Sequence, residues 1–190
     1  MMKVMICIAG LPAVGKTSVA RALNALLSPR ATHMDIDDIK REVIDSKDLT
    51  RDIDPDDIRE QYYESMIQRA IAFFDECDYV IAEEVFHRHY LRNHITRKCS
   101  HHGIDVRWVH VLCSEEVVKR RIKIEPRKGH ILTTEQTLSF YRKFSDLFDD
   151  FSESENALSL NSENGDAFFM AEMVISALIP EMKASDVINM

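Results

Sequence analysis

The chain has 190 residues, of which 45% are hydrophobic and 29% are charged, a balance typical of one globular domain with a sizeable core. Its formal net charge of −8 provides no general attraction for a polyanion, which weighs against a general nucleic-acid-binding protein. No apolar run approaches the ~20 residues of a membrane helix, and the four cysteines lack metal-binding spacing, so we expect a cytoplasmic protein with reduced thiols.

Short apolar runs alternate with helical patterns along the chain. We expect strands over 3–9, 31–34, 78–82, 105–112 and 157–160. Between and after them we expect helices over 16–27, 36–45, 89–101 and 167–179. Three more helices are expected: a long one opened by Asp54 and Pro55, one capped by Ser114, and one from Thr133 or Thr134 to about Phe151. This alternation predicts an α/β fold with a five-stranded parallel sheet and helices on both faces. We expect one domain over residues 1–180 and a loosely held tail over 181–190.

A glycine-rich motif directly follows the first expected strand. Residues 10–17, G-L-P-A-V-G-K-T, match the pattern G-x-x-x-x-G-K-[ST] in full, and a helix is expected after them. Such a loop turns backbone N–H groups toward phosphate oxygens, while its lysine reaches the β- and γ-phosphates and its hydroxyl takes a Mg²⁺ position. The motif therefore predicts a nucleoside triphosphate and Mg²⁺ as cofactors, with Lys16 also catalytic and Thr17 also a metal ligand. The expected nucleotide-binding residues are Gly10, Leu11, Pro12, Ala13, Val14, Gly15, Lys16, Thr17 and Ser18.

Carboxylates and basic residues follow the second expected strand, at the sheet edge where the motif should lie. A hydroxyl that accepts a phosphoryl group needs a carboxylate to orient it and take its proton. Asp37 is the candidate, with Asp35 and Asp38 as alternates; Asp35 is also expected among the residues that bind the acceptor. Lys40 and Arg41 come one helical turn later, where they could hold an anionic part of the acceptor. Alternatively, Asp35 or Asp37 caps a helix and the other acids lie in its solvated first turn.

The third expected strand ends in two acids, Glu83 and Glu84. An acid at this position can hold Mg²⁺ through water or orient the attacking group, so Glu83 is expected to serve the metal or the acceptor. The alternative is a capping or surface acid. Beyond it, Arg88 and Arg92 are expected to line the acceptor site. The histidines near them lack the H-E-x-x-H order and thiolate partners of a zinc site, so no metal cluster is expected there.

A basic segment, residues 120–129, contrasts with the acidic chain around it. An arginine that closes over a transferring γ-phosphate stabilises its negative charge and excludes water. Because Pro126 and Gly129 break the helical pattern, we expect a short lid over about 120–132, with Arg120, Arg121 and Arg127 as catalytic contacts. The alternative is an amphipathic helix with a solvated basic face.

Together these motifs resemble those of the small AAA-like P-loop kinases, which include polynucleotide kinases, gluconate kinases, chloramphenicol phosphotransferases and zeta-type toxins. The resemblance covers roughly residues 3–179, and it rests on the P-loop and on Asp37-Asp38-Ile39-Lys40, which looks like the group's D-D-x-R element. It implies a P-loop NTPase fold like that of nucleoside monophosphate kinases, ATP as the nucleotide, Asp37 as the acceptor base and Lys40 as an acceptor contact. The chain departs from the group at Glu83, where Asp is common, and at Lys40, where Arg would bind an anion bidentately.

The leading hypothesis is an ATP- and Mg²⁺-dependent kinase that phosphorylates a hydroxyl of a small-molecule acceptor. One alternative is a nucleotide-dependent switch or regulatory ATPase that binds a partner protein. Another is a polynucleotide 5′-hydroxyl kinase, which the acidic composition disfavours. The identity of the acceptor, the choice of ATP over GTP and the oligomeric state stay open.

Overall fold

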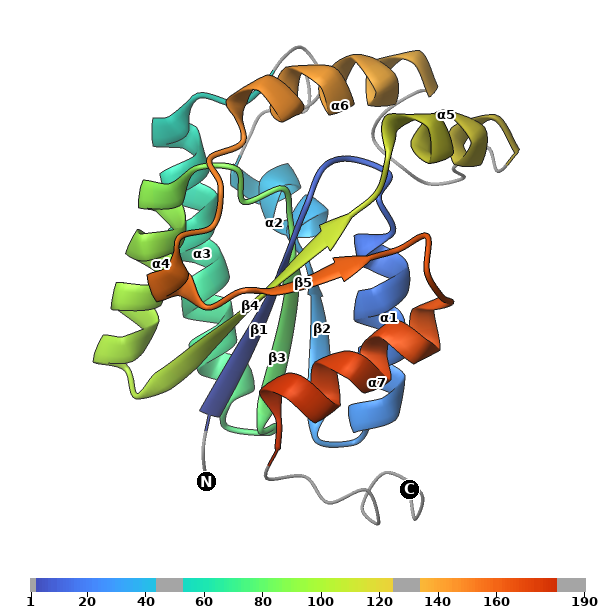
Figure 1. Ribbon diagram of the computed structural model, residues 1–190. Coiled ribbons are helices and arrows are strands. Elements are labelled where there is room, and N and C mark those ends of the chain that lie inside the picture. The colour runs from blue at the N-terminus through green and yellow to red at the C-terminus, as the bar shows by residue number, and fades with distance from the viewer. Residues whose placement is uncertain (1–2, 44–52, 125–133, 181–190) are drawn as a thin grey trace.

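The computed structural model describes residues 3–43, 53–124 and 134–180. Its centre is one five-stranded sheet in the order β2-β3-β1-β4-β5, with every neighbouring pair parallel (Figure 1). The five-stranded parallel sheet expected from the sequence is confirmed. The strands are β1 (Lys3–Ala9), β2 (Ala31–Asp35), β3 (Tyr79–Glu83), β4 (Ile104–Leu112) and β5 (Leu158–Asn161).

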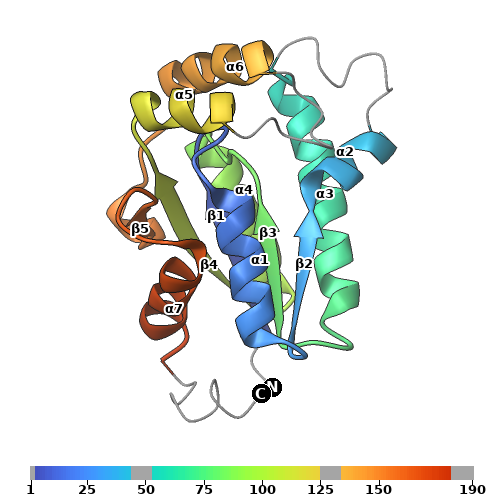
Figure 2. The ribbon, with the colours of Figure 1, turned by 90° about the vertical axis from the view of Figure 1, so that its right-hand side faces the viewer.

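Helices cover both faces of the sheet, as Figures 1 and 2 show. Helices α1 (Lys16–Leu27) and α7 (Ala167–Leu178) lie on one face, where Leu23 and Val174 join its core. Helices α3 (Asp56–Phe73) and α4 (His89–His101) lie on the other, where Tyr63 and Ile95 are buried. Because apolar side chains meet both faces, β1 is buried from Val4 onward and reads as a continuous apolar run.

The remaining α-helices lie at the carboxyl end of the sheet (Figure 1). They are α2 (Ile36–Val43), α5 (Glu115–Ile124) and α6 (Thr134–Leu147). In a parallel sheet this edge is where ligands bind, because the loops that follow all the strands meet there. Among the described residues, no helix has both the length and the apolar character needed to cross a membrane.

Two details of the elements differ from the expectations. The long helix starts at Asp56 with Pro55 as its N-cap, and Asp54 accepts a hydrogen bond from Arg59 Nε through its backbone carbonyl instead of capping the helix. Helix α6 ends at Leu147 rather than near Phe151, because the carbonyls of residues 149 and 150 turn toward a buried guanidinium described below. The expected tail over 181–190 and the lid residues from 125 to 132 lie outside the described residues.

Candidate active site

The P-loop connects β1 to α1 with backbone angles that favour glycine. Gly10 has φ +148°, and a Cβ on it would lie 2.4 Å from the backbone oxygen of Val111 in β4, so any side chain there would force the loop away from the sheet. Gly15 has φ +106° and precedes the first turn of α1. Lys16 Nζ donates a hydrogen bond of 3.0 Å to the Leu11 carbonyl across the loop. The expected strand–loop–helix setting of the motif is therefore present.

Thr17 and Glu83 meet directly at the carboxyl end of the sheet. The Thr17 hydroxyl donates a hydrogen bond of 2.9 Å to Glu83 Oε2, and the other oxygen of this carboxylate lies 3.4 Å from His33 Nε2. Glu83 is the last residue of β3 and pairs in register with Ile8 of β1 and Asp35 of β2. Mg²⁺ prefers oxygen ligands, so this hydroxyl and carboxylate fit a Mg²⁺ site beside the P-loop.

Asp35 and Asp37 have different environments at the end of β2. Asp35 Oδ1 accepts a hydrogen bond of 2.8 Å from the Asp37 backbone N–H, so Asp35 caps α2 instead of presenting this oxygen to an acceptor. Asp37 is half-buried in the first turn of α2, and no hydrogen bond from a described residue engages its carboxylate. Burial raises the pKa of Asp37, and Glu84 and Asp35 add to this, while Lys40 opposes it.

Lys40 and Arg41 are each paired within the protein. Lys40 Nζ donates a hydrogen bond of 3.0 Å to Glu84 Oε1, and Arg41 pairs with Asp38 at 2.5 Å on the exposed side of α2. Arg59, which is 1% exposed, donates to the same Glu84 oxygen at 3.2 Å. Sequence reasoning missed Arg59 because nothing in the pattern of α3 separates it from solvent-facing residues. Glu84 could be noticed in the sequence, because it is an acid that directly follows the end of β3.

Arg88 lies at the edge of this region. Its guanidinium is 3.7 Å from Asp56 Oδ2 and 3.8 Å from Asp149 Oδ1, and it donates to the Leu147 carbonyl at 3.4 Å. It therefore connects the start of α3 to the end of α6.

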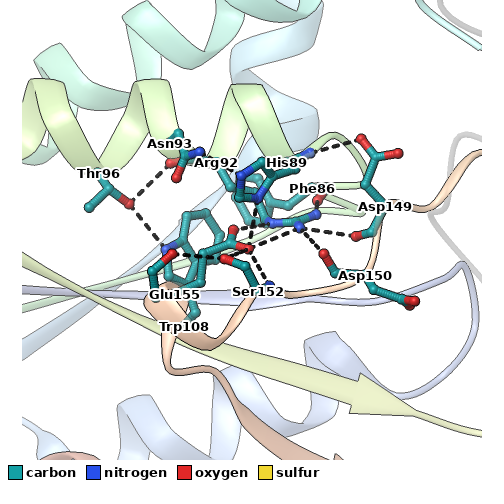
Figure 3. A network of polar contacts seen from close by, with 11 residues as sticks. Phe86, His89, Arg92, Asn93, Thr96, Trp108, Asp149, Asp150, Ser152 and Glu155 are labelled. Carbon is teal, nitrogen blue, oxygen red and sulfur yellow. Dashed lines mark hydrogen bonds and ion pairs between the residues drawn. The ribbon is translucent and has the colours of Figure 1, made fainter.

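Arg92 corrects an expectation, because it is 0% exposed and belongs to a structural network (Figure 3). Its guanidinium binds both carboxylate oxygens of Glu155, at 2.6 and 3.3 Å. It also donates to the carbonyls of Phe86, Asp149 and Asp150 at 2.9, 3.0 and 2.9 Å. With its donors engaged inside the protein, Arg92 does not belong to the acceptor site, and its role is to hold residues 149–155 against α4.

In the described part of the basic segment, Arg121 contacts the P-loop. Arg121 Nη1 donates to the Val14 carbonyl at 3.2 Å and to Ser162 Oγ at 2.9 Å, which ties α5 and the segment after β5 to the phosphate loop. Arg120 is exposed on the same helix. Arg127 lies outside the described residues.

Solved structures with the same architecture cover nearly the whole chain. An unliganded sugar kinase from Janibacter sp. HTCC2649 matches with a TM-score of 0.71 at 15% identity, covering 94% of this chain and 95% of that chain. A gluconokinase from Sinorhizobium meliloti 1021 matches at 0.68 and 14% identity, covering 96% and 99%. The Mycobacterium tuberculosis APS kinase, in complex with AMPPNP and APS, matches at 0.67 and 16% identity, covering 94% and 98%. At these identities the likenesses show the fold.

The P-loop, its strand–loop–helix setting and the parallel sheet define a P-loop NTPase. A model of the AAA domain family matches residues 6–135, and the chain belongs to that family. The resemblance to the AAA-like P-loop kinases expected from the motifs is confirmed by this match and by the solved structures. No curated protein sequence matches the chain.

Proposed function

We propose that the protein is a phosphotransferase that moves the γ-phosphate of Mg·ATP to a hydroxyl group of a small molecule. The observation that carries this proposal is the placement of Asp37 beyond β2, with a raised pKa and a carboxylate that no described residue engages by a hydrogen bond. A hydroxyl acceptor requires such a base near the phosphate loop. In a regulatory ATPase the attacking group is a water molecule, so no base for a separate acceptor is required.

Each part of the site then has a role in phosphoryl transfer. The P-loop amides and Lys16 hold the triphosphate, and Thr17 with Glu83 would hold Mg²⁺. Bound Mg²⁺ supplies positive charge that neutralises the phosphate oxygens. Asp37 orients the acceptor hydroxyl and takes its proton as the oxygen attacks. Arg121, which contacts the Val14 carbonyl of the P-loop, and Arg120 on the same helix would add positive charge that stabilises the transferring phosphoryl group, and the same role is proposed for Arg127 from the sequence.

The similar solved structures support this class of reaction. Two are a sugar kinase and a gluconokinase, and the APS kinase was solved in complex with AMPPNP and APS. Because the identities are 14 to 16%, the acceptor must be inferred from this chain's own residues.

The test is Mg²⁺-dependent ADP production with and without pooled hydroxyl acceptors: sugars and sugar acids, nucleosides, aminoglycoside-like and phenicol compounds, and nucleic-acid 5′ ends. Lys16→Ala and Asp37→Asn should each abolish stimulation by an acceptor, whereas Asp57→Asn, a matched change at an exposed position of α3, should not. Turnover that ignores every pool and survives Asp37→Asn would contradict the proposal and favour a regulatory ATPase.

A further inference from the structure

Two basic residues, Lys40 in α2 and Arg59 in α3, share one buried carboxylate. Lys40 and Arg59 both donate to Oε1 of Glu84, at 3.0 and 3.2 Å, and Arg59 also lies 3.9 Å from Asp54 Oδ2. We call these four residues, Lys40, Asp54, Arg59 and Glu84, the Glu84 cluster. Arg59 is 1% exposed and Glu84 is 8% exposed, so water screens these charges poorly.

Glu84 stays ionised within this cluster. Its burial raises its pKa, but Lys40 and Arg59 outweigh burial and lower the pKa of Glu84 to about 2. The charge of Lys16 in the P-loop contributes in the same direction. Glu84 therefore interacts electrostatically with both the P-loop lysine and Asp37.

Neighbouring basic residues on this side of the site are compensated as well. Arg41 pairs with Asp38 at 2.5 Å, and Arg88 lies between Asp56 and Asp149 at 3.7 and 3.8 Å. His87 is buried, and burial together with Arg59 lowers its pKa to about 4, so it adds no charge at neutral pH. In the described part of the chain, each of these cations on this side of the site has an acidic ion-pair partner, although Arg88 Nε makes no hydrogen bond.

Among the described residues, the charges of the Glu84 cluster and of the base add up to a negative value. Lys40 and Arg59 contribute two positive charges, while Asp54, Glu84 and the ionised base Asp37 contribute three negative charges. Arg41 and Asp35, which also act on Asp37, cancel each other, so the net charge of these groups is −1. A second negative charge brought by the acceptor would be repelled, and it would have to displace Glu84 to reach Lys40 or Arg59.

We propose that the acceptor is an uncharged or positively charged hydroxyl compound, and not a sugar acid or a phosphorylated molecule. This inference rests on the proposed phosphotransferase function and names its substrate class. It differs from the expectation that Lys40 and Arg41 hold an anionic part of the acceptor, because both residues already pair with acids of this chain.

The expected discrimination follows from Coulomb's law. One unit charge acting on another across roughly 7 Å, at an effective dielectric constant near 20, changes an affinity by about tenfold to a hundredfold. An uncharged acceptor should therefore exceed its matched anion by at least about tenfold in kcat/KM.

The experiment compares matched acceptors that differ in charge but keep a hydroxyl: glycerol with glycerate, glucose with gluconate and glucosamine, and uridine with uridine 5′-monophosphate. ADP production gives kcat/KM for each. Binding of each compound is measured in parallel by calorimetry on the full chain loaded with Mg²⁺ and a non-hydrolysable ATP analogue. Glu84→Gln and Asp54→Asn each remove one negative charge from the Glu84 cluster. Glu42→Gln removes one from an exposed ion pair with Arg69 on the outer side of α2.

In at least one set of matched acceptors, we expect the neutral or cationic member to bind more tightly and to have a higher kcat/KM than the anionic member. We also expect Glu84→Gln or Asp54→Asn to reduce its advantage about tenfold, and Glu42→Gln to preserve it. If Glu84→Gln fails to fold, as judged by circular dichroism, Asp54→Asn gives the answer. Preference for the anions, an unchanged ratio in the folded cluster variants, or no binding of any compound would overturn the inference. Binding of neutral compounds without turnover would support the acceptor class and contradict the phosphotransferase function.

Discussion

Replacing Arg92 with alanine should destabilise the protein more than any other single arginine substitution on α4. The guanidinium is 0% exposed, binds Glu155 through both carboxylate oxygens and also donates to the Phe86, Asp149 and Asp150 carbonyls. Glu155, 3% exposed in its side chain, would keep His89 Nδ1 at 2.9 Å and the Ser152 N–H at 2.8 Å, but would lose its buried positive partner.

Breaking a buried ion pair by removing one partner costs about 3–5 kcal/mol. Since the free energy of unfolding of an ordinary domain is about 5–15 kcal/mol, this loss is a large share of the total stability. Replacing both Arg92 and Glu155 with methionine should recover only part of the loss, because three backbone carbonyls still lose their donor.

The assay is urea unfolding at pH 7, followed by circular dichroism. Arg97→Ala, at an exposed position of the same helix, is the matched control and should change the free energy of unfolding by no more than about 0.5 kcal/mol. A loss below about 1 kcal/mol for Arg92→Ala would refute the reasoning, since it would mean that solvent or another cation compensates Glu155.

The same pair predicts a dependence on pH. Burial raises the pKa of Glu155, but hydrogen bonds from Arg92 and from the Ser152 N–H outweigh it and lower this pKa from 4.5 to about 2. A depressed carboxyl pKa stabilises the folded state above the unfolded value, and this contribution is lost as the pH falls from 4.5 toward 2. The slope of stability against pH in that window should be shallower in Arg92→Ala. An identical slope in both proteins would count against a direct effect of Arg92.

Three further predictions concern the active site. Gly10→Ala should abolish nucleotide binding in a calorimetric titration, because its Cβ would lie 2.4 Å from the Val111 oxygen; a variant that binds as well as wild type would show that the loop can move away from β4. Glu83→Gln should raise the Mg²⁺ concentration needed for half-maximal ADP production at least about tenfold, as loss of a metal-binding carboxylate does, and an unchanged requirement would remove Glu83 from the metal site. Since the pKa of Asp37 is raised above its usual 3.8, acceptor-dependent kcat/KM should fall with decreasing pH through a midpoint above 3.8, and a midpoint below that value would exclude this base.

The parts of the site that the sequence predicted are encoded within short segments. The P-loop occupies eight consecutive residues between a strand and a helix, and Asp37 follows the end of β2 within two residues. Their positions follow from one topological rule, because parallel strands bring such segments to a shared edge. The sheet could be predicted for the same reason, since each strand is a separate apolar run.

The parts that the sequence did not reveal depend on partners far away in the chain. Arg59 meets Glu84 across 25 positions, and Arg92 meets Glu155 across 63. Arg92 was expected at the acceptor because an exposed arginine and a buried one look alike in a sequence. Only the packing of α4 against residues 149–155 distinguishes them. The different environments of Asp35 and Asp37 likewise depend on which carboxylate turns back to the helix.

The way in which Arg92 anchors residues 149–155 has a consequence for how this protein can diverge. At Asp150 the guanidinium donates to the backbone carbonyl and not to the side chain. This contact therefore depends on the path of the backbone and not on the residue type at this position. A homologue could therefore carry another residue at this position and keep the same path from α6 to β5, provided that the arginine and its carboxylate partner persist as a pair. We expect sequence drift in this connection to be tolerated where it changes side chains, and to be deleterious where an insertion or deletion shifts the carbonyls away from the guanidinium.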